Sequence, residues 1–448
     1  MTRVLAAAGL LLIGGCTTYR QSPVSAAANA EALMTRSIES AAVQQVVAKE
    51  HPEMNAAPWP PERWTPELLS LAAIALHPDL DVARAEWQAA RAALRTAAER
   101  PNPTASVGVE HKATGGNGSP WVSTLALDVP IETAGKRGAR VEQAKALTAA
   151  AAADLDQAVW TVRTRTANAA VDLASARQLA EERRREVALR EEIVTMLERR
   201  LAVGEAAQPD VTRMRADARA SRLLLREEEG RGAEREAALA ASIGIPRAAL
   251  PPLDLSMSSP SPFVDATRLR TLALTARPDV LAALARYDAA EQALRLEVRK
   301  QYPDLHIGPG IGWDQGAFRW AISAAAEIPI FNQHRGPIGE AEAQRGTAAA
   351  QLAALQSRIL SDLDAALANE ATARARFEEA ERLVASRHAL VSAARHQFDA
   401  GEIDRLALRS QEVESVLAEI DRWSAWFDMQ RAAIAIDAAV EQPAGGLR

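Results

Sequence analysis

Cysteine and histidine are the residue types whose spacing could build a reactive or metal-binding site in this sequence of 448 residues. A single cysteine, Cys16, excludes an intrachain disulfide and a thiolate metal cluster. His388 and His396, the closest histidines expected on one helix, stand two turns apart, too far to share a metal ion. No nucleophile–base pair or group of carboxylates stands out from the charges expected on helix surfaces. We therefore expect no catalytic residue, no bound metal, no cofactor and no enzymatic activity.

The surroundings of Cys16 are typical of a lipoprotein signal peptide. Residues 4–13 form an apolar stretch that is too short to span a bilayer, and Gly14 and Gly15 are small residues suited to cleavage before a cysteine. We expect residues 1–15 to be removed and Cys16 to carry the lipid; an ordinary signal peptide with a chance cysteine is the alternative. Thr17 rather than aspartate follows, which leaves sorting to the outer membrane of a Gram-negative cell open.

The composition favours long, closely packed helices. Alanine, the best helix former, supplies 99 residues, whereas only 4% of residues are aromatic. This balance argues against an all-β protein or an α/β enzyme. The net charge of −6 gives no overall basic balance that would point to nucleic acid.

The second half of the chain repeats the first at an offset of 197 to 200 residues, which indicates an internal duplication. The matching segments keep their order along the chain: 77–80 with 277–280, 128–131 with 327–330, 137–138 with 335–336, and 204–205 with 401–402. We divide the chain into a signal peptide (1–15), an N-terminal extended segment (16–64), a first repeat (65–243), a linker (244–264), a second repeat (265–440) and a C-terminal tail (441–448).

Each repeat begins with a helix that Pro78 or Pro278 interrupts, and Thr65 and Asp265 mark the two starts. Alternating apolar residues then predict two strands per repeat, over 103–113, 119–130, 303–313 and 319–329. A long helix follows in each repeat and ends near Gly204 or Gly401, after which a return helix runs to about 243 or 440. Eleven of fourteen positions along each long helix are apolar at coiled-coil spacing, so we expect helix pairs to pack along these seams.

Four strands with one apolar face cannot bury their edges in lipid, because each unpaired backbone group there costs several kcal/mol. If the strands span a membrane, two chains would close a filled eight-stranded barrel, and three would close a twelve-stranded barrel with a channel. We expect six side chains to face lipid: Trp121, Leu125, Leu127, Trp313, Trp320 and Ile322. The alternative is a pair of soluble hairpins capping a periplasmic coiled-coil bundle.

The duplicated plan resembles the TolC family of outer-membrane efflux proteins, in its lipoprotein branch that works with RND-type pumps. The motifs that carry this resemblance are Ala75-Leu76-His77-Pro78-Asp79-Leu80, Ala276-Arg277-Pro278-Asp279-Val280, Val129-Pro130-Ile131, Ile328-Pro329-Ile330-Phe331 and Ala241-Ser242-Ile243-Gly244-Ile245-Pro246, with the tip sequences 200–205 and 397–402. They occur in order and cover about residues 60–440.

The resemblance implies a mainly α protein with a small β part, in which three chains form a twelve-stranded outer-membrane barrel continued by a periplasmic α-helical coiled-coil barrel. It implies a passive exit duct that receives cargo from a periplasmic membrane-fusion adaptor and an inner-membrane pump. A structural lipoprotein that spaces the cell envelope is the alternative. The sequence does not select the cargo among drugs, metal ions and solvents.

The helical tips are the expected docking surface for the adaptor, through Val203, Gly204, Glu205, Gly401 and Glu402. Both glycines would also serve as helix C-caps. Family members often carry a ring of aspartates at the periplasmic entrance, and here only Asp404, next to Arg405, lies in the matching run. These two residues are therefore the candidate gate, and a simple N-cap role for Asp404 is the alternative.

Overall fold

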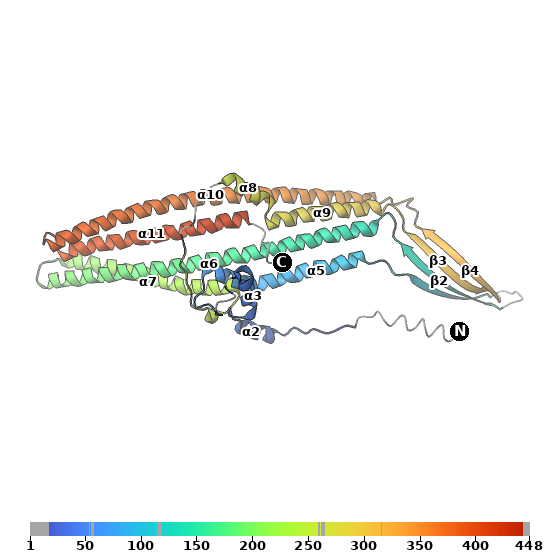
Figure 1. The fold of residues 1–448 in the computed structure, drawn as a ribbon, viewed down its shortest axis with the longest axis horizontal. Helices are drawn as coiled ribbons and strands as arrows, with labels where there is room; N and C mark the ends of the chain where they lie inside the picture. Colours follow the sequence, from blue (N-terminus) through green and yellow to red (C-terminus); the bar gives the residue numbers. More distant parts are fainter. Residues whose placement is uncertain are drawn as a thin grey trace.

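Two long helical hairpins and a small sheet make up most of the chain in the computed structural model (Figure 1). The structure describes residues 18–441, except 53, 55–57, 114–118, 259, 261–264 and 315. Cys16 and residues 114–118, which separate the first two predicted strands, lie outside these residues. The hairpins run side by side along the rod, and the strands lie at one end of it (Figure 1). The mainly helical fold class with a small β part is confirmed.

The same series of elements occurs twice, as the duplication predicts. The first repeat contains α4 (Pro66–Leu76), α5 (Pro78–Ala98), β1 (Thr104–His111), β2 (Trp121–Ile131), α6 (Lys136–Ala202) and α7 (Gln208–Ile243). The second contains α8 (Ala266–Thr275), α9 (Pro278–Arg299), β3 (Leu305–Asp314), β4 (Ala317–Ala326), α10 (Arg335–Asp399) and α11 (Arg405–Val440). Every predicted strand end lies within three residues of the observed one.

Local signals explain where the first helices begin and break. The backbone N–H of Leu68 donates to Thr65 Oγ1 (3.4 Å), and that of Arg268 donates to Asp265 Oδ1 (2.9 Å), so both predicted caps form. Pro78 and Pro278 each open a new helix, because proline has no N–H for the ladder but fits the first helical turn.

The long helices pack along the predicted seams. α6 has 67 residues and is about 100 Å long at 1.5 Å per residue. Val162 and Leu173 on α6 and Leu363 on α10 are almost completely buried. Besides packing against α7, α6 also packs against α11, which joins the two hairpins. None of the helices formed by the described residues is long and apolar enough to cross a membrane.

The predicted N-terminal extended segment is wrong in part, because the structure has two helices there: α2 (Ala26–Met34) and α3 (Ala41–Glu50). Ser25 caps α2, and Val43 and Val47 of α3 are buried against α4. The segment also contacts the linker, because Trp64 is buried and forms an isolated parallel β-bridge with Leu253. In the linker a short 3-10 helix, η2 (Arg247–Ala249), follows α7.

Candidate functional site

The four strands form one antiparallel sheet in the order β1-β2-β3-β4. Leu125 lies opposite Val107 on β1 and Ile311 on β3, and Ile311 lies opposite Trp320 on β4. These four residues form one row that crosses all four strands on the same face of the sheet. Within the part of the chain that the structure describes, the outer edges of β1 and β4 have no strand partner, and every residue of β4 is exposed. One chain therefore leaves both edges of the sheet open.

All six side chains that were predicted to face lipid lie on this apolar face and are exposed. Trp320 is 73% exposed and Ile322 is 70% exposed, values far above those of core residues. The prediction missed Phe318, whose ring lies 5.3 Å from that of Trp313 on the same face. Alternation extended by one step, from Trp320 back to Phe318, would have found it.

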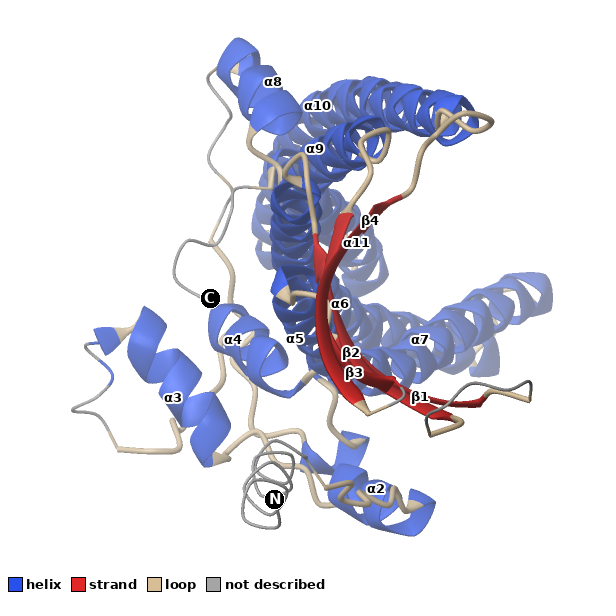
Figure 2. Cartoon of the chain, turned by 90° about the vertical axis from the view of Figure 1, so that its right-hand side faces the viewer, coloured by secondary structure: helices blue, strands red, loops and turns tan. Residues whose placement is uncertain are grey.

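The opposite face is small and polar. Gly308, Gly310 and Gly312 lie on it, together with Thr124 and Ser323 from the neighbouring strands. A Cβ atom at Gly308 would lie 2.5 Å from Ser323 Oγ and 2.9 Å from the Leu127 carbonyl oxygen, so only glycine fits there. Seen from the strand end, the sheet is a curved layer, and the long helices form an arc behind it (Figure 2). Each chain thus supplies a curved wall with two chemically different faces.

The two helical tips lie together at the end of the rod farthest from the strands (Figure 1). Gly204 and Gly401 adopt left-handed conformations with φ of +80° and +76°. The N–H of Glu205 donates to the Arg200 carbonyl, and that of Glu402 to the Gln397 carbonyl, each at 2.8 Å. Both helices therefore end in the same Schellman motif, and the C-cap role of the glycines is present. Val203 is 71% exposed beside them, so the five predicted docking residues share one surface.

Asp404 joins the two tips. Its carboxylate accepts from the backbone N–H of Ala407 (2.8 Å) and caps α11, and it also accepts from Arg200 Nη2 of the other hairpin (2.7 Å). These hydrogen bonds, first from Ala407 and then from Arg200, hold the pKa of Asp404 below its ordinary value. The structure thus shows the N-cap role together with an ion pair that sequence reasoning missed. Arg405 is exposed next to it.

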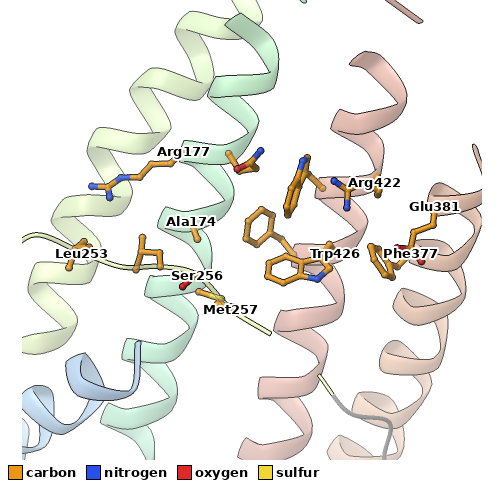
Figure 3. Close-up of a pocket in the computed structure, with 13 residues that line it drawn as sticks. Ala174, Arg177, Leu253, Ser256, Met257, Phe377, Glu381, Arg422 and Trp426 are labelled. Carbon is orange, nitrogen blue, oxygen red and sulfur yellow. The ribbon is translucent and has the colours of Figure 1, made fainter. Parts of the chain in front are cut away.

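A cavity of about 630 Å³ lies between the two hairpins, under the linker (Figure 3). Trp423, Trp426 and Phe427 of α11 line it, and Leu255 and Met257 of the linker form another wall. Leu255 and Met257, in the predicted linker, therefore also pack against the hairpins, and the aromatic residues at 423–427 are the signal for this packing in the sequence. Trp426 and Phe427 are largely buried against α6, so this region holds the repeats together.

Among the residues that the structure describes, no group of three or more His, Cys, Asp or Glu side chains is placed to hold a metal ion.

Comparisons with known proteins agree with this geometry. The family described as "Outer membrane efflux protein" matches residues 69–245 and 269–441. The chain is 26% identical over 264 residues to the cobalt-zinc-cadmium resistance protein CzcC of Cupriavidus metallidurans, an alignment that covers 58% of this chain and 61% of that relative. The chain thus matches less than two thirds of the length of this curated relative.

Solved structures share the fold. The outer membrane protein VceC of Vibrio cholerae matches with a TM-score of 0.69 and 22% identity, over 84% of this chain and 96% of that one. The open state of the MtrE outer membrane channel of Neisseria gonorrhoeae matches with a TM-score of 0.68 and 17% identity, over 84% of this chain and 89% of that one.

Proposed function

Because the chain belongs to the outer membrane efflux protein family, we propose that three copies of it form a passive exit duct through the outer membrane of a Gram-negative bacterium. The family consists of transport proteins and not enzymes, and the predicted membership is confirmed. The observation that carries the proposal is the two-faced sheet with open edges. In hydrocarbon those edges must pair, and three chains supply twelve strands, enough to close a barrel with a lumen.

The apolar face of this barrel turns to lipid, and the small polar face lines the lumen. The long hairpins continue the duct into the periplasm, where an adaptor and an RND-type pump deliver the cargo. The name of the relative from Cupriavidus metallidurans makes cobalt, zinc and cadmium ions the first cargo to test here, with drugs and solvents as the alternatives.

Planar-bilayer recordings test the duct directly. We expect the purified full chain to migrate as a heat-sensitive trimer and to conduct ions across a bilayer. A structural envelope lipoprotein, the competing function, would give no conductance even if it formed trimers. Trimers without conductance would therefore overturn the exit duct.

We propose that the tips dock the adaptor, with Val203, Gly204, Glu205, Gly401 and Glu402 as contact residues. The packing of the hairpins ends there, since the last apolar cluster between them includes Leu197, Val211 and Val413. A coiled-coil adaptor hairpin would extend the grooves between the helix pairs. The Asp404–Arg200 pair, with Arg405, is the proposed gate, because separating the hairpins to open the entrance breaks it.

Photo-crosslinking tests this docking. A photoreactive residue at 203 or 402, in cells that contain the cognate pump, is expected to form crosslinks to the adaptor. The matched control is position 181 on α6, which is exposed but lies farther from the tip. Crosslinks from 181 in place of 203 and 402 would show that the adaptor binds elsewhere.

We propose that Cys16 is lipid-modified and anchors the chain beside the barrel. Residues 16–25 span at most about 33–36 Å when extended, and α5, with 21 residues, is about 32 Å long. Met34 of α2 shares a pocket with Pro78 at the start of α5. The lipid can therefore reach the base of the strands, and one protein-bound diacylglycerol plus an acyl chain suffices for stable attachment.

Mass spectrometry of the mature protein is expected to show diacylglycerol on Cys16. The Cys16→Ala variant should lack the lipid and still form trimers, because the barrel itself holds the protein in the membrane. A mature chain that begins elsewhere would contradict the lipidation.

A further inference from the structure

Charge lies only at the two ends of the small polar face, among the residues of the sheet that the structure describes. At the end next to the helices, His306 Nδ1 of β3 lies 2.9 Å from Asp128 Oδ2 of β2. At the far end, Asp314 pairs with Lys112 (2.7 Å) and Arg319 (3.3 Å), and Glu110 lies in the same row. The residues between the ends are uncharged and small: Ser106, Gly108, Thr124, Ala126, Gly308, Gly310, Gly312, Ala321 and Ser323.

The two ends of this face carry different chemistry. At the far end, Asp314 forms ion pairs with two cations, Lys112 and Arg319. The near end instead pairs one carboxylate with one imidazole, and imidazole is the side chain that changes charge between pH 5 and pH 8. The side chains of His306 and Asp128 are 44% and 48% exposed, so both remain in contact with water. Their combined charge is therefore −1 at high pH and zero once the ring is protonated.

We infer that the three Asp128–His306 pairs of the assembled duct form a selectivity ring that makes its preference for cations depend on pH. The inference rests on the proposed barrel, which brings three pairs to one level of the lumen. A ring of three carboxylates raises the local concentration of cations in the lumen, as charged rings do in other pores. Protonation of the three imidazoles cancels the charge of the pairs and weakens the preference for cations.

The other charged groups around His306 do not change this expectation. Asp304, two residues before it, accepts from Lys136 Nζ (2.8 Å), so this pair is neutral throughout the range. Pro130 of β2 and Ala325 of β4 pair with His306 and carry no charge. Glu327, two residues beyond Ala325, adds a further carboxylate near this end of the sheet.

Reversal potentials in a salt gradient across planar bilayers test the ring. At low ionic strength, we expect the cation-to-anion permeability ratio of the wild-type channel to fall roughly two- to fivefold from pH 8 to pH 5. The His306→Gln channel should show the same cation preference at pH 5 as at pH 8. Asp128→Asn should lower the ratio at pH 8 and lower it further at pH 5, because the imidazolium is then unpaired. A purely structural pair would not produce these opposite shifts.

The control is His111→Gln, since His111 lies on the apolar face of the same sheet, against Trp121. It should keep the full pH response. A pH-independent ratio in the wild type, or a full response in His306→Gln, would overturn the ring while the conductance still supports the duct. Absence of conductance in the wild type would overturn the duct and the ring with it. If Asp128→Asn does not assemble, the comparison of His306→Gln with His111→Gln still shows whether His306 causes the pH response.

Discussion

Replacing Leu125 with arginine is expected to destabilise the barrel by about 2–4 kcal/mol per chain, because a charge would face lipid near the middle of the membrane. Leu125 lies in the middle of β2, in the apolar row that crosses all four strands. Three chains carry the same change, so the effect is multiplied in the trimer. We expect the heat-sensitive trimer to disappear from outer-membrane extracts.

Ala126→Arg is the matched control, since it places the same side chain one residue further along the same strand. Ala126 pairs with Gly310 on the small polar face, which the proposed barrel turns to its lumen, and the glycine has no side chain that would meet the arginine. The trimer should therefore persist, with lower conductance. Spin labels at 125 and 126 should likewise differ in accessibility to water. Equal loss of trimer from both variants would show that the alternation does not separate lipid from lumen.

The parts of this fold that could be predicted from sequence are those that local signals determine. Strand alternation, the proline breaks and the two glycine C-caps each act within a few residues, and the structure has all of them. The residues of the apolar face were also predictable, because one strand register places every second residue on the same face of the sheet.

Contacts between distant segments could not be predicted. His77 and Arg277 occupy the same position in the two repeats but act differently. His77 Nδ1 accepts from the Asp79 N–H (3.2 Å), whereas Arg277 Nη1 donates to the carbonyls of Ala438 and Ala439 at the end of α11. At the end of α7, the corresponding donor is Arg36 of the N-terminal segment, which reaches the Gly244 carbonyl (3.4 Å). Periodicity carries no information about such a partner.

The partners of charged residues within the predicted seam could not be predicted either. Arg183 and Arg190 occupy seam positions where apolar residues are expected. The structure explains them through Glu186, which is almost completely buried and accepts from Arg183 Nη1 (2.7 Å), Arg190 Nε (2.9 Å) and Ser221 Oγ of α7 (2.7 Å). The carboxylate thus bridges the two helices of the first hairpin.

Burial alone would raise the pKa of Glu186, but the hydrogen bonds from Arg183, Ser221 and Arg190 outweigh it and hold the pKa below the ordinary value of 4.5. A carboxyl whose pKa is lower in the folded than in the unfolded state stabilises the fold above the unfolded pKa. That contribution is fully present at pH 7 and is lost as the pH falls below about 4.5.

Glu186→Ala is therefore expected to lower the free energy of unfolding by about 3–5 kcal/mol at pH 7, because it leaves two half-buried guanidinium groups and a buried hydroxyl without their acceptor. Thermal unfolding followed by circular dichroism measures the loss.

Glu181→Ala is the control. Glu181 pairs with Arg184 (3.2 Å) at the surface of the same helix, so its replacement should lower the free energy of unfolding by less than about 1 kcal/mol. The difference between the variants should shrink as the pH falls from 4.5 through the lowered pKa of Glu186, because the folded wild type then also loses the carboxylate charge. Equal melting temperatures for the two variants at pH 7 would show that the buried carboxylate contributes no more than a surface ion pair.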